Sequence, residues 1–211
     1  MLSNMPLSQN DSLERHNIPL EKLVHSAISN GASDAHPIST DAISVRDELA
    51  QYCLEPHKCP NYGLAPSCPP HVTGPAGFRE LITNHPRAIA VKIDVSTKVL
   101  MSDERRNIYR SLHEVVARVE HEAVEMGYTD SKAFAGGSCK TIFCYEYEKC
   151  NQLFGMGECL YPQSARPSMS GFGVDVAALM KTCGWPATFV THEIGGNATK
   201  MSWIAGLVLI G

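Results

Sequence analysis

Apolar residues recur at every third or fourth position in three stretches of the chain, which is the spacing of one helix face. The three stretches cover residues 19–29, 103–126 and 174–183. The second is the clearest, and we expect Ser102 to cap its start and Gly127 to end it. The sequence therefore predicts three helices, each with an apolar face to bury.

Other stretches have the composition of β-strands. Residues 88–95 (AIAVKIDV) are rich in β-branched side chains and predict a buried strand. Residues 35–45 are extended but contain Pro37, which favours an edge strand because proline lacks the backbone donor that a central strand needs. Further strands are expected at 128–135, 187–194 and 202–210, with the last two joined by a tight reversal at Gly195-Gly196-Asn197.

This order predicts an α+β fold: a small, mostly antiparallel sheet with helices packed on it and cysteine-rich metal-binding loops at its end. We expect residues 1–17 to form a flexible tail and residues 18–211 to form a single domain. The net charge of −4 and the scattered basic residues give no nucleic-acid footprint, and no apolar run is long enough for a membrane span.

Seven of the eight cysteines fall into two groups, which is typical of metal coordination. The N-terminal residues show no secretory signal, so we expect a cytoplasmic protein in which disulfides are disfavoured. The first group is Cys53, Cys59 and Cys68, and the second is Cys139, Cys144, Cys150 and Cys159. Cys183 stands apart at the end of an apolar helix, where a buried structural thiol is expected.

The second group supplies four thiolates, which is enough for a complete site. Its gaps of four, five and eight residues lack the Cys-x2-Cys turn of zinc knuckles. A four-iron, four-sulfur (4Fe-4S) cluster is larger than a single ion, and its ligands can come from wider loops, so an iron–sulfur cluster is preferred and zinc remains the alternative.

The first group supplies three thiolates on a stiff loop that contains six prolines between Cys53 and Pro75. It needs a fourth ligand or leaves an open position. His57 and His71 are candidate ligands, and Tyr62 is a candidate for contact with whatever is bound there. His113 and His121 lack the spacing of a zinc-protease helix and are expected on a solvated helix face.

Three strings resemble a known family. CPNYGLAPSCPP (59–70), GGSC with the cysteines that follow it (136–159), and ECLYPQSARPSMSGFGVDV (158–176) are similar to segments of the cysteine-rich "predicted metal-binding" proteins of unknown function, which are widespread in anaerobic bacteria and archaea. The resemblance spans the chain from about Gly31 onward and implies a cysteine-ligated metal, with iron–sulfur favoured. The family's second group usually has shorter gaps than this chain.

Arg166, Ser168 and Asp175 belong to the third of these strings. Arg166 could neutralise cluster charge, hold an anionic ligand or have a structural role. Ser168 is expected to cap the next helix, with Asp175 in the first turn of that helix.

The leading hypothesis is an iron–sulfur protein with one or two clusters that carries electrons or serves a redox or metal-handling protein partner. A redox enzyme that binds substrate at the incompletely ligated first group is a second hypothesis, and a zinc-stabilised interaction module is a third. Whether the protein is an enzyme stays open, and a homo-oligomer is possible.

Overall fold

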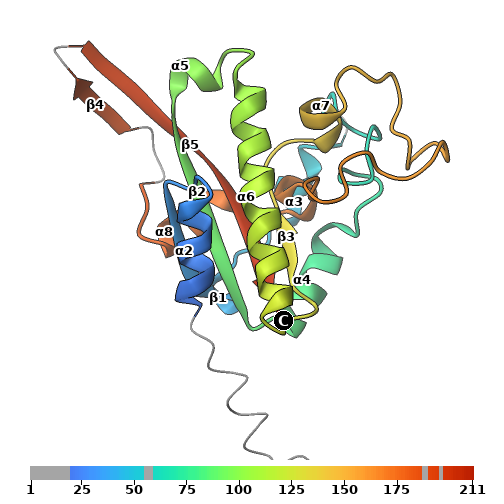
Figure 1. Cartoon of the computed structure of the whole chain (residues 1–211), viewed down its shortest axis with the longest axis horizontal. Coiled ribbons are helices and arrows are strands. Elements are labelled where there is room, and N and C mark those ends of the chain that lie inside the picture. Colours follow the sequence, from blue (N-terminus) through green and yellow to red (C-terminus); the bar gives the residue numbers. More distant parts are fainter. Residues whose placement is uncertain (1–19, 55–58, 187–189, 195–196) are drawn as a thin grey trace, which may run out of the picture.

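The computed structural model describes residues 20–54, 59–186, 190–194 and 197–211. Its centre is a five-stranded antiparallel sheet in the order β1-β2-β5-β3, with β4 paired to β5 (Figure 1). The strands are β1 (Asp34–Ser39), β2 (Arg87–Ser96), β3 (Lys132–Phe134), β4 (Val190–Ile194) and β5 (Asn197–Ile210). With helices packed on both faces of this sheet, the α+β fold expected from the sequence is confirmed.

The helices differ widely in length, from four residues to 21. The α-helices are α2 (Glu21–Ser29), α3 (Asp47–Gln51), α4 (Gly74–Asn84), α5 (Thr97–Leu100), α6 (Arg105–Glu125), α7 (Cys139–Phe143) and α8 (Val176–Thr182). Two 3-10 turns, η2 (Thr40–Ala42) and η3 (Met169–Phe172), complete the description.

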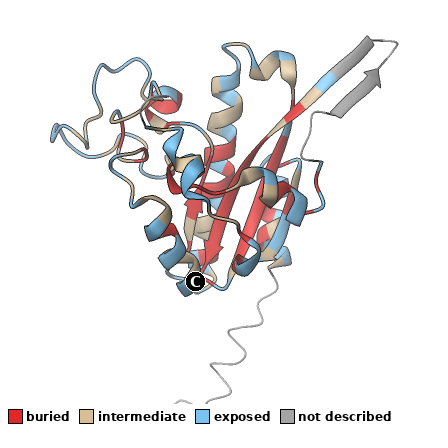
Figure 2. Ribbon diagram, turned by 180° about the vertical axis from the view of Figure 1, so that it is seen from behind, coloured by how far each residue is buried: buried red, intermediate tan, exposed pale blue. Residues whose placement is uncertain are grey.

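The two faces of the sheet are covered by different helices. Alternating side chains of β2, such as Ile89 and Val91, pack with Leu23 of α2 and Leu112 of α6. The opposite face receives residues of α4, η3 and α8, and Figure 2 shows the buried strands between these layers. Successive side chains of a strand point to opposite faces of the sheet, so each face has its own set of buried apolar side chains.

The three predicted helices are present with slightly shifted ends. The long helix α6 begins at Arg105, and its N-cap is Glu104 rather than Ser102. The hydroxyl of Ser102 instead accepts a hydrogen bond from the Glu104 N–H in the turn before the helix, at 3.2 Å. Gly127 has a φ of +98°, the conformation expected of a residue that ends a helix.

The strand predictions also hold, with changes in length. Pro37 lies in β1 at the edge of the sheet, as expected, and β2 covers the predicted 88–95. The final strand is longer than predicted because it begins at Asn197, where it pairs with Ile194 of β4. The predicted start of β4, residues 187–189, and the glycines of the reversal lie outside the described residues.

Helices α3, α4, α5 and α7 were not predicted. Helix α4 begins at Gly74, directly after the stiff loop, and has proline in its first turn, where the missing N–H costs nothing. Its Phe78 is fully buried against Phe134 and Phe172. None of the helices in the described ranges combines the length and apolar character that a membrane span requires.

Candidate metal centre

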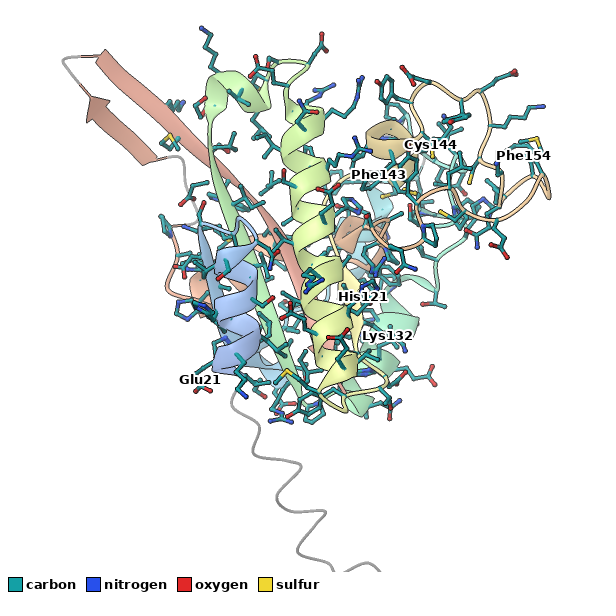
Figure 3. All side chains as sticks on the ribbon, viewed as in Figure 1. Glu21, His121, Lys132, Phe143, Cys144 and Phe154 are labelled. Atoms are coloured by element: carbon teal, nitrogen blue, oxygen red, sulfur yellow. The ribbon has the colours of Figure 1, made fainter. Side chains whose placement is uncertain are left out.

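The two cysteine groups lie beside the β3 side of the sheet, in long loops that contain little regular structure (Figure 1). The loop of the first group runs from the end of α3 to α4. The loop of the second group begins with α7 and continues to η3. Figure 3 shows Cys144 near the start of the second loop and Phe154 at its outer edge.

The four cysteines of the second group line one cavity of about 330 Å³. Other residues that line this cavity include Lys140, Phe143 and Tyr161. All four thiols are free and partly buried. The structure therefore brings together the complete four-thiol set that the sequence predicted as one site.

The three cysteines of the first group line a second, smaller cavity of about 120 Å³. Tyr62, the candidate for contact with a bound group, also lines this cavity. The other described residues around it are Asn61, Pro69, Gly137, Ser138, Ser168, Ser170 and Gly171. His71 is exposed and lines a different cavity, and His57 lies outside the described residues.

Ser67 lies between a cysteine of each group. Its hydroxyl lies 3.1 Å from the Cys139 sulfur, which belongs to the larger cavity, and 3.8 Å from the Cys68 sulfur, which belongs to the smaller one. The groups are thus neighbouring sites with separate cysteine sets. They are close enough for a thiolate in one to influence a thiol in the other.

The pKa shifts of the thiols follow from this crowding. The pKa of Cys139 is raised to about 12, mainly by burial. The Ser67 hydrogen bond lowers this pKa, and the nearby Cys68, Cys159 and Cys150 contribute to the rise. Burial also raises the pKa of Cys53, and the nearby Cys59 and Cys68 raise it as well. Without a cation, several thiolates in this space would repel one another, whereas a bound metal stabilises the deprotonated form.

Backbone donors already point at one sulfur in each cavity. The Asn61 N–H donates to the Cys59 sulfur at 3.5 Å, and the Tyr161 N–H donates to the Cys159 sulfur at 3.4 Å. In both cases the donor is two residues after the cysteine. Hydrogen bonds to sulfur stabilise the negative charge of metal-bound thiolates.

Lys140 is buried beside the larger cavity, which sequence analysis did not anticipate. Its ammonium group donates to the carbonyl oxygens of Cys144 at 2.7 Å and Tyr147 at 2.5 Å. A buried cation satisfied by two carbonyls holds the turn after α7 in place. It also favours the charged form of Cys144, although burial is the larger effect and raises the pKa of that thiol overall.

Arg166 borders the larger cavity, but its guanidinium is committed to protein groups. It pairs with Glu120 of α6, with Nε 2.7 Å from the carboxylate, and donates to the carbonyl oxygens of Pro162 and Ala165. The charge is therefore balanced within the protein, and the arrangement favours the structural role among the three that the sequence left open.

His113 is fully buried, so the expectation that it lies on a solvated face is wrong. Helix α6 packs on the sheet with one side and on the second cysteine loop with another, and His113 lies on that second side. Its Nδ1 accepts from the Arg166 N–H at 3.1 Å, so Nε2 carries the proton and donates to the Gly136 carbonyl. Burial lowers the pKa of His113 to about 4.

The serine and aspartate of the third string also differ from expectation. Asp175, expected in the first turn of α8, is instead its N-cap and accepts from the Ala178 N–H at 2.9 Å. Ser168 occupies the N-cap of η3 but makes no capping bond. Cys183 is buried in the apolar cluster under the sheet, as expected, and lines neither cysteine cavity.

The cysteines provide a soft donor set that suits a metal. Within the part of the chain that the structure describes, no three His, Cys, Asp or Glu side chains converge closely enough to share one metal ion. The four thiols of the second group nevertheless line one cavity. Soft sulfur donors and N–H donors aimed at sulfur fit a cysteine-ligated metal.

Fold and site together define a cysteine-rich α+β protein of the metal-binding class. The chain belongs to the family described as predicted metal-binding protein (DUF2284), whose model matches residues 36–210. The family resemblance noted in the sequence is thereby confirmed. Searches of curated proteins and of solved structures find no match to this chain.

Proposed function

We propose that this protein holds a four-iron, four-sulfur cluster through Cys139, Cys144, Cys150 and Cys159 and carries electrons for a protein partner in the cytoplasm. The observation that carries the proposal is that these four thiols, and no other cysteine among the described residues, line one cavity of about 330 Å³. Such a cluster supplies one-electron chemistry at a potential set by its surroundings.

The groups around this cavity suit a negatively charged, thiolate-ligated cluster. Lys140 and the Tyr161 N–H place positive charge and a donor near the sulfurs, and Arg166 holds the segment after Cys159 against α6. These contacts hold the segments that carry the cysteines. Zinc is less favoured because the spacing lacks a Cys-x2-Cys turn and the thiols surround a space wider than one ion requires.

Exposed apolar side chains support the proposal of a protein partner. Large apolar residues in the described chain are half-exposed mostly in the two cysteine loops. In the second loop these are Tyr145, Tyr147, Phe154, Met156 and Leu160. A group of exposed apolar side chains commonly marks a contact surface, and this one covers the loop that would carry the cluster.

The test is anaerobic reconstitution with iron and sulfide of three proteins: the wild type, Cys150→Ala and the control Cys183→Ala. We expect the wild type and Cys183→Ala to develop the same broad visible absorption. Cys150→Ala should lose most of the absorption that a cluster on the second cysteine group contributes. Equal absorption in Cys150→Ala and the wild type, or no absorption in either, would contradict the proposal.

A further inference from the structure

In each of two Ser-Cys dipeptides, the serine borders one cavity and the cysteine borders the other. In Ser67-Cys68, the serine borders the larger cavity and the cysteine the smaller. In Ser138-Cys139, the serine borders the smaller cavity and the cysteine the larger. Ser67 has a clear role, because its hydroxyl contacts the Cys139 sulfur at 3.1 Å. The question is what the corresponding hydroxyl of Ser138 contacts.

Ser138 occupies the N-cap of α7, a position where serine ordinarily accepts a hydrogen bond from the helix backbone. Ser96 does so at the start of α5, where its hydroxyl accepts from the Val99 N–H at 3.3 Å. The hydroxyl of Ser138 makes no such bond. Its side chain therefore has a reason to be serine other than capping.

The Ser138 hydroxyl is also buried without a partner. The residue is 3% exposed, and its oxygen has no hydrogen-bond partner among the described residues. An unsatisfied buried hydroxyl destabilises the folded state, so such groups are rare unless a ligand, ion or water completes their hydrogen bonding. The cavity that Ser138 borders is lined by three cysteines and, among the described residues, by no further Cys, His, Asp or Glu.

We propose that the smaller cavity holds a second metal centre and that the Ser138 oxygen is its fourth protein ligand, beside Cys53, Cys59 and Cys68. This inference rests on the proposed function, because it assumes that the chain is loaded with iron and sulfide. On binding, an oxygen lone pair occupies the fourth position, and the hydroxyl proton passes to solvent as the thiol protons do.

The consequence is a closed site rather than an open one. With Ser138 in the fourth position, no coordination site is left for a substrate, which separates this inference from the hypothesis of an enzyme with an open iron. The adjacent residues Ser138 and Cys139 would then ligate different centres, which joins the two sites through one peptide unit. Gly136 and Gly137 before them, the latter with a φ of +77°, let the backbone turn between the cavities.

The experiment measures iron and sulfide per chain and the electron paramagnetic resonance of the reduced protein after anaerobic reconstitution. The variants are Ser138→Ala, Ser138→Cys, Cys59→Ala and the control Ser168→Ala, a second N-cap serine on the same cavity that makes no capping bond. We expect Ser138→Ala to lose as much iron as Cys59→Ala, about half if the centres are of equal size. Ser138→Cys and Ser168→Ala should keep the wild-type content, and Ser138→Cys should show an altered resonance.

The outcomes separate this inference from the proposed function. A wild type without iron contradicts the proposed function. If the wild type contains iron and Ser138→Ala contains the same amount, only this inference is contradicted. The same holds if iron is lost in Ser168→Ala instead. Far-ultraviolet circular dichroism of each variant checks that the sheet is folded, and Ser138→Cys keeps the test decisive if Ser138→Ala folds poorly.

Discussion

The sheet and the cysteine loops are held by different forces. In the sheet, β2 and β5 pair over ten residues and bury apolar side chains on both faces. The cysteine loops contain short helices, and several of their large apolar side chains are half-exposed. Apolar burial therefore stabilises the sheet, whereas under the proposed function we expect bound metal to stabilise the loops.

Metal removal should separate the two regions most sharply, because we expect its effect to be confined to the loops. After chelation under reducing conditions, we expect amide hydrogen exchange in residues 59–73 and 139–167 to accelerate by tenfold or more (~1.4 kcal/mol or more of lost protection). Amides of β2 and β5 should be unchanged, because their protection comes from the sheet. Uniform acceleration across the chain would show that the two regions are not independent.

A cavity created in the core should destabilise the sheet and leave the metal content unchanged. Leu112 of α6 is fully buried against the sheet, so Leu112→Ala should lower the free energy of unfolding by about 2–5 kcal/mol. Urea denaturation measures this loss, and iron content per folded chain should stay at the wild-type value. Loss of iron in the folded variant would mean that the core and the metal centres are coupled.

His113 lies between the sheet and the second cysteine loop, and it should make the stability of the folded protein pH-dependent. The unfolded imidazole binds a proton near pH 6.5, while the folded one does so only near 4, so acid favours the unfolded chain. We expect about 3 kcal/mol of stability, complete above pH 6.5, to be lost as the pH falls toward 4. Urea denaturation across this range should show a shallower pH dependence for His113→Gln.

The matched control is His25→Gln, because His25 is exposed on α2. This variant should follow the wild-type pH profile. If His113→Gln does so too, the buried neutral imidazole is not the source of the acid sensitivity.

Gly171 offers the smallest and most local test. A Cβ at this position would lie 2.9 Å from Cδ of Pro69, which follows Cys68 in the loop of the first group. Gly171→Ala should therefore displace that loop and cost about 1–3 kcal/mol. We expect the metal of the first group to be retained less well, with the second group unaffected. Gly184→Ala is a control without a close neighbour, although its positive φ adds backbone strain.

The sequence predicted the sheet well because its signals are local. The β-branched run of residues 88–95 and the apolar stripe of α6 each predict one element, and Pro37 predicts an edge. Helix α4 was missed because its pattern is short and begins beside prolines. The burial of His113 could not be predicted, since it depends on a loop more than 20 residues away packing on α6.

The candidate site was predictable as two cysteine groups but not as two adjoining cavities. The contact through Ser67 depends on tertiary structure. One signal was present in the sequence: the dipeptide Ser-Cys occurs at 67–68 and again at 138–139, and these are the residues that cross between the cavities. The commitment of Arg166 to Glu120 had no such signal.

Metal and acid-labile sulfide content of the protein purified without oxygen tests the central claim most directly. We expect iron with an equal amount of sulfide, at about four irons per chain or more. Zinc without sulfide would contradict it and would instead support a zinc-stabilised interaction module.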